Sequence, residues 1–252
     1  MVWVICLFRG LAINNCDLEK IIVKRQNASL ISTAIQYGAQ GVARFPSLSN
    51  ISIIHNDRIR GGDEAIWLAA KHFSENKNHY RQMEKLLSSW DLGLSGVEII
   101  EKEVIAENGM AKIWQPYGKH KTHLKEYILP FSNESSGTQA AFFLLALLLS
   151  ILTEGGVAII DEFENDLHPH MLEPILDLFA SEKTNPHNAQ LLFSCHAVEV
   201  LNLVHKSQIM LVQKNNDCES TACRLDKIEG IRADDNFYGK YMAGHYGAIP
   251  NF

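Results

Sequence analysis

Two adjacent carboxylates, Asp161 and Glu162, end a short apolar run in the sequence VAIIDE at 157–162. Four apolar residues in a row predict a buried strand. The carboxyl ends of such strands form the edge of a parallel sheet at which α/β proteins bind ligands. An Asp at that edge can hold Mg²⁺ beside nucleotide phosphates, and a neighbouring Glu can polarise an attacking water. The alternative is a strand that simply ends in two solvated acids, which is common, so the motif alone does not decide.

A second apolar run, AQLLFSCH at 189–196, ends in His196. One helix-length segment separates it from the first run, so the two runs are expected to form neighbouring parallel strands that end at the same sheet edge. A histidine there can hydrogen-bond a phosphate oxygen or an attacking water. A lone histidine at a strand end more often caps the next helix, and it is the spacing from Asp161 that favours a functional partner.

The polar loop ESSGTQ at 134–139 precedes a long apolar segment. Its hydroxyl groups, its backbone N–H groups and the positive end of the following helix together can bind an anion. The residues concerned are Ser135, Ser136, Gly137 and Thr138. The alternative is an ordinary helix N-cap formed by Ser135 or Ser136.

The segments that must position these residues alternate between strand and helix patterns. Strands are predicted at 155–161, 189–196 and 207–214, with helices at 170–181 and 197–205 between them. The run 140–152 predicts a buried helix, because it is shorter than the roughly 18 residues that a membrane span requires. The fold class is therefore α/β with a mostly parallel sheet.

The first half of the chain has a different pattern. Strands are expected at 21–26 and 50–55, two amphipathic helices between 63 and 90, and a β-hairpin with ragged arms from 97 to about 131. We therefore expect an α+β arm or lid with a hairpin at 1–125, followed by a nucleotide-binding lobe at 126–252.

The amino-acid composition is typical of a soluble globular protein, and the formal net charge of −6 indicates no overall affinity for nucleic acid. The five cysteines form no C-x-x-C pair, which fits a reducing cytoplasm. The opening MVWVICLF lacks the basic region of a signal peptide. We expect a cytoplasmic protein that does not insert into a membrane.

The order of the three motifs resembles the C-terminal lobe of ABC-type ATPases, in particular the RecF/SMC/OLD-like group of AAA ATPases. The loop ESSGT is similar to the signature loop, Asp161 and Glu162 to the Walker B pair, and His196 to the switch histidine. The D-loop match comprises Asn165, Asp166, Leu167 and His168, followed by a proline. The ending YMAGHYGAIP at 241–250 resembles stand-alone ATPases of bacterial anti-phage systems of the retron and Septu type.

This resemblance implies specific roles. The cofactors would be ATP and Mg²⁺, with Asp161 holding the metal, Glu162 activating water and His196 contacting the γ-phosphate. Ser135 to Thr138 would reach the ATP of a second subunit in a head-to-tail homodimer. A partner nuclease or other effector, and DNA, are further expected partners.

One element of the family pattern is missing from the sequence. No stretch fits G-x-x-x-x-G-K-[ST], the loop that cradles phosphates; YGKHKT at 117–122 lacks the first glycine. We therefore expect the chain to be the C-terminal portion of a longer or split ATPase, with little activity alone. The alternative is a non-catalytic dimerisation or partner-binding module derived from such an ATPase.

Overall fold

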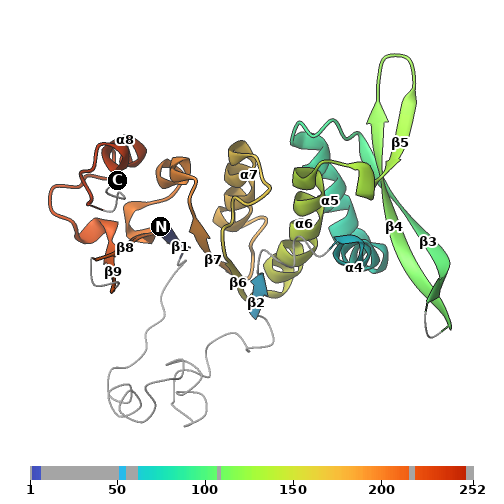
Figure 1. Ribbon diagram of the computed structural model, residues 1–252, viewed down its shortest axis with the longest axis horizontal. Coiled ribbons are helices and arrows are strands. Elements are labelled where there is room, and N and C mark those ends of the chain that lie inside the picture. The colour runs from blue at the N-terminus through green and yellow to red at the C-terminus, as the bar shows by residue number, and fades with distance from the viewer. Residues whose placement is uncertain (1, 7–50, 55–61, 107–108, 216–218, 248–252) are drawn as a thin grey trace, which may run out of the picture.

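The computed structural model describes residues 2–6, 51–54, 62–106, 109–215 and 219–247 (Figure 1). The strand predicted at 21–26 lies outside these residues. The strands are β1 (Val2–Cys6), β2 (Ile51–Ile54), β3 (Gly96–Ala106), β4 (Gly109–Lys121), β5 (Glu126–Pro130), β6 (Val157–Ile160), β7 (Gln190–Cys195), β8 (Ile209–Lys214) and β9 (Ser220–Arg224). The helices are α4 (Gly62–Glu75), α5 (Lys77–Ser89), α6 (Ser136–Glu154), α7 (Pro169–Ala180) and α8 (Phe237–Met242).

A six-stranded sheet carries the C-terminal part of the chain, with strand order β2-β6-β7-β1-β8-β9. The strands β2, β6 and β7 pair in parallel, and α7 connects β6 to β7. The α/β class is thus confirmed. The two predicted strands that carry Asp161 and His196 are neighbours, with Ile160 opposite Phe193.

The rest of this sheet differs from the expected parallel arrangement. The third predicted strand, β8, runs in the same direction as β7 but does not pair with it, because β1 lies between them and is antiparallel to both. The predicted helix at 197–205 is also wrong: only a short 3-10 turn, η4 (Val198–Asn202), forms there. Its β-branched residues Val198 and Val200 have low helix propensity, and the segment is too short to offset it.

The predicted hairpin is a three-stranded antiparallel sheet of order β3-β4-β5. The last stretch of the pattern, at 126–130, forms a separate edge strand instead of extending a hairpin arm, with Tyr127 opposite His120. The division predicted at residue 125 stays a prediction. Strand β5 continues the arm's sheet beyond that point, while β1 and β2 lie in the six-stranded sheet.

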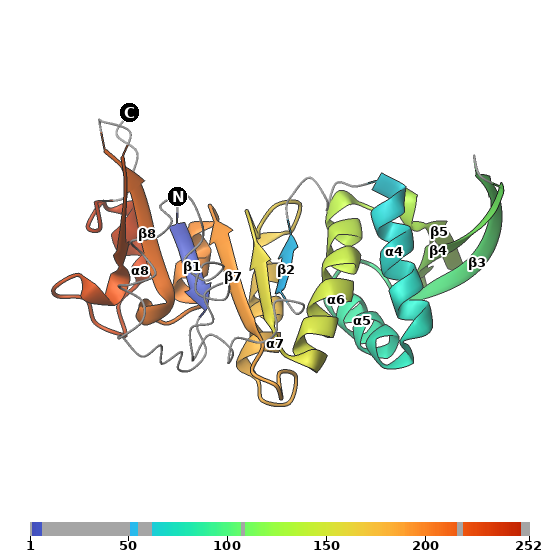
Figure 2. The same cartoon turned by 90° about the horizontal axis from the view of Figure 1, so that it is seen from below.

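Helices α4, α5 and α6 lie between the two sheets (Figures 1 and 2). Helix α6 is apolar around most of its circumference, and eleven of its residues are buried. Aromatic rings of α6 pack against those of its neighbours. The ring centroid of Phe142 lies 5.0 Å from that of Phe73 in α4 and 4.6 Å from that of Phe131, the first residue of the turn η3 (Phe131–Asn133). One hydrophobic core therefore runs from the arm's sheet into the six-stranded sheet.

The helix α6 has 19 residues, more than the 13 of the apolar run 140–152 from which it was predicted. By length and composition it could therefore cross a membrane. In the folded chain, 61% of that stretch is buried inside the protein. The prediction of a buried helix is confirmed. A core helix packed on several sides needs an apolar surface all round, so its composition imitates a membrane span.

Two histidines, the half-buried His72 and the buried His79, tie the three helices together. His72 of α4 and His79 of α5 approach with Nε2 and Nδ1 2.9 Å apart, and His79 Nε2 lies 2.9 Å from Thr153 Oγ1 of α6. Burial lowers the pKa of both rings below the ordinary value of 6.5, and for His79 the charge of His72 lowers it further. Both rings are thus harder to protonate than a free imidazole.

This arrangement predicts acid sensitivity. Since the pKa of each ring is lower in the folded chain than in the unfolded chain, the unfolded chain binds more protons below about pH 6.5. Stability is therefore fully present above that pH and is lost as the pH falls. Urea unfolding should show a midpoint that drops between about pH 7 and pH 5, and His72→Gln/His79→Gln should shrink that drop. An identical drop in the double variant would contradict the assignment.

Candidate functional site

The two predicted carboxylates follow the end of β6, as the sequence pattern requires. Asp161 is exposed, whereas Glu162 is half-buried and has a positive backbone φ of 50°. This region of backbone space is costly for a residue other than glycine, and strain of this kind is concentrated at functional sites. The turn places the two side chains differently although they are adjacent in sequence.

Ser194, the penultimate residue of β7, holds this turn in place. Its hydroxyl accepts a hydrogen bond from the backbone N–H of Glu162 at 2.7 Å and donates one to Asp161 Oδ1. Its carbonyl accepts from the N–H of Phe163 at 2.9 Å. Ser194 is 1% exposed, so these bonds form away from competing water. The carboxylate pair is thereby fastened to the neighbouring strand.

His196 lies just beyond β7 and is exposed. Its backbone N–H donates to Glu164 Oε1 at 2.5 Å, so a residue of the carboxylate segment holds the backbone of the predicted switch histidine. The other oxygen of Glu164 is buried and has no hydrogen-bond partner among the described residues. Burial, followed by the nearby charge of Glu164, raises the pKa of the Cys195 thiol, which makes this cysteine an inert core residue.

The loop ESSGT leads into α6, and Ser135 is the N-cap of that helix. Its Oγ accepts from the N–H of Thr138 at 3.2 Å and lies 2.8 Å from Thr138 Oγ1. The predicted capping role of Ser135 is thus confirmed. Ser136 and the Ser135 side chain face solvent, whereas Thr138 is buried. Of the four signature-loop residues, Ser135, Ser136 and the half-buried Gly137 are therefore within reach of an external ligand.

The signature-like loop and the D-loop-like segment meet at Gly137. A Cβ atom added to Gly137 would lie only 2.7 Å from the backbone oxygen of Asp166, so the two segments touch through backbone and only glycine fits. Asp166 also has a positive φ, of 61°. The ESSGT loop therefore contacts the 161–168 segment, and the strand end that carries His196 contacts the same segment through Glu164.

The remaining D-loop residues form a tight series of turns. The N–H of Asn165 donates to the carbonyl of Glu162, and the N–H of Leu167 donates to that of Glu164. Leu167 is buried, whereas His168 is exposed and is the N-cap of α7, accepting from the N–H of His170. The rings of His168 and His170 stack with centroids 5.2 Å apart, which agrees with a structural role.

The carboxylate edge suits a magnesium ion that is shared with phosphates. Among the described residues, no group of three or more His, Cys, Asp or Glu side chains is placed to enclose a metal ion. Magnesium bound with nucleotides needs only one or two carboxylates, since phosphate oxygens and water fill the other positions. The exposed Asp161 at the strand end meets that requirement.

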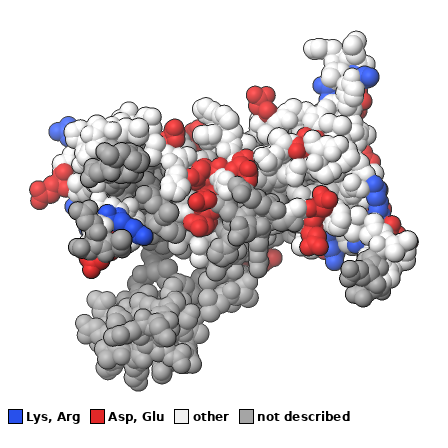
Figure 3. All heavy atoms as spheres, viewed as in Figure 1, with Lys and Arg blue, Asp and Glu red and all other residues white. Residues whose placement is uncertain are grey.

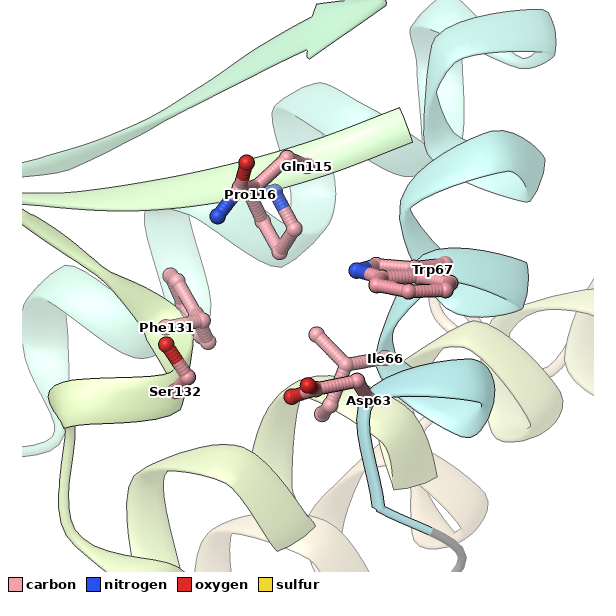
Figure 4. Close-up of a pocket in the computed structure, with 7 residues that line it drawn as sticks. All are labelled: Asp63, Ile66, Trp67, Gln115, Pro116, Phe131 and Ser132. Atoms are coloured by element: carbon pink, nitrogen blue, oxygen red, sulfur yellow. The ribbon is translucent and has the colours of Figure 1, made fainter. Parts of the chain in front are cut away.

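A small open pocket lies away from these carboxylates, between α4, β4 and η3 (Figure 4). Asp63, Trp67, Gln115 and Ser132 contribute polar or aromatic groups, and Ile66, Pro116 and Phe131 complete the lining. It belongs to the arm. No sequence motif pointed to it, because its residues come from three separate segments.

Acidic side chains gather at the middle of one face, and both acidic and basic side chains lie at its ends (Figure 3). On this face the described residues form no continuous basic track of the kind that follows a nucleic acid backbone.

Sequence reasoning located Asp161, Glu162, His196 and the ESSGT loop, and missed Ser194 and Glu164. Ser194 lies in the run AQLLFSCH, and Glu164 lies between the run VAIIDE and the D-loop match that begins at Asn165. A serine beside a predicted functional histidine and a carboxylate two residues after the predicted pair were the available signals. Their roles depend on bonds between β7 and the 161–168 segment, which one-dimensional spacing does not reveal.

Residues 52–202 match a family model described as "AAA domain, putative AbiEii toxin, Type IV TA system". The match covers more than half of the chain and includes each of the predicted site residues. No curated protein matches the chain.

The Ser194 bridge gives a direct test of how this site is held. Ser194→Ala should lower the free energy of unfolding by about 1–3 kcal/mol, because it removes the partner of the Glu162 N–H and of Asp161 Oδ1. Ser74→Ala is the matched control: its hydroxyl bonds only the exposed carbonyl of Lys71, and its loss should cost under about 0.5 kcal/mol. Equal urea midpoints for the two variants would show that the bridge is unimportant.

Proposed function

The chain belongs to the AAA-domain family that this model describes, and we propose that it supplies the carboxylate half of an ATP-hydrolysing site of the ABC type, within the RecF/SMC/OLD-like group. AAA domains are nucleotide-dependent ATPases of the P-loop class, and the finer assignment depends on the residues at the edge of the six-stranded sheet.

One observation supports the proposal most strongly. Asp161 and Glu162 follow one parallel strand, His196 follows its neighbour, and Ser194 and Glu164 join the two ends by hydrogen bonds. An exposed carboxylate, a half-buried carboxylate on a strained backbone and the backbone of His196 are thus held side by side at the carboxyl end of two parallel strands, the edge at which α/β proteins bind ligands.

In the proposed reaction, Asp161 would hold Mg²⁺, which supplies charge neutralisation at the phosphate oxygens. Glu162 would orient the attacking water and accept its proton as the water oxygen bonds the γ-phosphorus and the bond to ADP breaks. His196 would donate a hydrogen bond to a γ-phosphate oxygen. The hydroxyl of Ser194 donates a hydrogen bond to Asp161 Oδ1 and thereby fixes the orientation of this carboxylate.

The contact between Gly137 and Asp166 suggests how two chains would combine. The loop of Ser135, Ser136, Gly137 and Thr138 and the segment of Asn165, Asp166, Leu167 and His168 lie against each other. Both would face a second subunit in a head-to-tail homodimer, in which the loop of one protomer contacts the nucleotide of the other through Ser135 and the N-terminus of α6.

Such a dimer would close when ATP binds and open after hydrolysis, and so act as a gate for an effector. A partner nuclease, DNA and a role in bacterial anti-phage defence in the cytoplasm are parts of this proposal that derive from the family resemblance. The description of the matching family, which names a putative AbiEii toxin and a type IV TA system, is compatible with a defence role.

A second function is favoured by a specific feature of the sequence. Because it contains no G-x-x-x-x-G-K-[ST] stretch, the phosphate cradle would have to come from elsewhere. If none is supplied, the chain would be a dimerisation or partner-binding module that retains the fold of an ATPase without its chemistry.

Cation binding tests the role of Asp161. With ATP present and Mn²⁺ replacing Mg²⁺ as the paramagnetic probe, Asp161→Asn should weaken Mn²⁺ binding by at least about tenfold, because the one exposed carboxylate of the strand end is lost. Glu162→Gln should leave binding nearly unchanged. Asp177→Asn is the matched control, since it removes the same charge from an exposed position on α7. Equal Mn²⁺ binding by the Asp161→Asn chain and the control would refute the assignment.

Turnover tests the half-site itself. The chain alone with Mg²⁺ and ATP should release phosphate at close to the uncatalysed rate, because neither a lysine nor a loop of N–H groups is provided to hold the β- and γ-phosphates. Steady hydrolysis that disappears in Glu162→Gln would overturn this expectation and would show that the chain contains a phosphate cradle of another kind.

A further inference from the structure

The first residue of the signature-like loop, Glu134, is bound to the arm's sheet. Its carboxylate Oε1 lies 2.7 Å from Nε2 of His120 on β4, and the Glu134 side chain is only 7% exposed. The other ring nitrogen of His120, Nδ1, lies 2.9 Å from the carbonyl oxygen of Gly93, in the segment between α5 and β3. One imidazole therefore bridges two elements of the arm and the loop before α6.

The chemistry of the two partners shows how this bridge is made. The carbonyl of Gly93 can only accept a hydrogen bond, so Nδ1 of His120 must carry a proton. The second hydrogen bond joins Nε2 of His120 to Oε1 of Glu134, and it is a charge-assisted ion pair whenever the ring carries both protons. Such bonds are stronger than neutral ones when they are partly shielded from water.

The sheet is shaped to admit this carboxylate. A Cβ atom added to Gly118 of β4 would lie 2.4 Å from Glu134 Oε1 and 2.7 Å from the side chain of Leu94. A side chain at this position would require Glu134 and Leu94 to shift. The glycine is thus explained by the approach of Glu134 and not by its own backbone conformation.

The backbone of Glu134 is held as firmly as its side chain. Its carbonyl accepts from Gln139 Nε2 at 2.9 Å, and its N–H donates to the carbonyl of Phe131. The next residue is Ser135, the N-cap of α6, and two residues further Gly137 touches the backbone of Asp166. A continuous set of contacts therefore runs from His120 to the segment that carries the carboxylates.

We propose that His120 and Glu134 are positioning residues, which hold the ESSGT loop in the place where it contacts the 161–168 segment and couple the arm to the ATPase half-site. The regulatory part of this inference rests on the proposed function; the coupling of the two segments does not. A ligand or partner that moves the arm's sheet would move the loop through this ion pair, and with it the surface that faces a second subunit.

Two substitutions of His120 separate its two bonds. Asparagine places an amide nitrogen near the position of Nδ1 and keeps the donor to Gly93, while glutamine places one near Nε2 and keeps the donor to Glu134. Hydrogen exchange of backbone amides, measured without nucleotide, should be about tenfold faster in His120→Asn at Thr138, Gln139, Asn165 and Leu167, since a bond to a charged group is lost. In His120→Gln it should stay close to that of the unchanged chain.

Glu134→Gln keeps the shape of the side chain and removes its charge, so it should speed exchange at the same amides. The His120→Asn/Glu134→Gln chain should exchange no faster than His120→Asn alone, because a single contact is removed. Lys112→Ala is the control, as it breaks an exposed ion pair with Glu101 in the same sheet. Exchange in α7 serves as the internal reference for global unfolding.

The inference is overturned if His120→Asn and His120→Gln speed exchange equally, or if the change is confined to β3, β4 and β5. It is also overturned if the double variant shows the product of the two single effects. No ATP or metal enters the exchange measurement, so its result is independent of Mn²⁺ binding at Asp161. If His120→Asn speeds exchange in the 161–168 segment but Asp161→Asn leaves Mn²⁺ binding unaltered, the proposed function is refuted and the coupling stands.

Discussion

Burial of one apolar helix is the constraint on which the rest of the structure depends. Helix α6 packs against α4 and α5 on the arm side and connects through Gly155 and Gly156 directly to β6. Its start is the ESSGT loop and its end leads to the strand that carries Asp161. Because close packing resists displacement of a core helix, the positions of both motifs are set by the same hydrophobic core.

Hydrogen bonds of Ser194 and Glu164 fix the positions of groups that the hydrophobic core brings near each other. Packing brings β6 and β7 side by side, but the positions of the carboxylates depend on Ser194, and the backbone of His196 depends on Glu164. The Ser194 links are partly shielded from water, where an unpaired polar group is costly and a satisfied one defines a single geometry. The positive φ of Glu162 is tolerated because its N–H is bound.

The arm and the sheet edge are thus two ends of one packed unit. The histidines between α4, α5 and α6 and the bridge from His120 to Glu134 are polar contacts at the borders of that unit. Through these contacts the arm is joined to the helix whose end leads to the sheet edge. The phosphate cradle is the component for which the sequence offers no motif.

Local pattern was enough to locate α4, α5, α6, α7, β6 and β7, since continuous apolar runs and helical periodicity reflect burial directly. It also located Asp161, Glu162, His196 and the capping Ser135, because strand ends and helix starts have recognisable residues. The alternation of strand and helix also predicted that β6 and β7 are neighbours, but no local pattern encoded the other pairings between distant segments. The insertion of β1 between β7 and β8, the bridge of Ser194, the clamp of Glu164 and the approach of Glu134 to Gly118 all join residues far apart in sequence. Only folding around α6 brings them within hydrogen-bonding distance, where geometry and not residue type decides which groups pair.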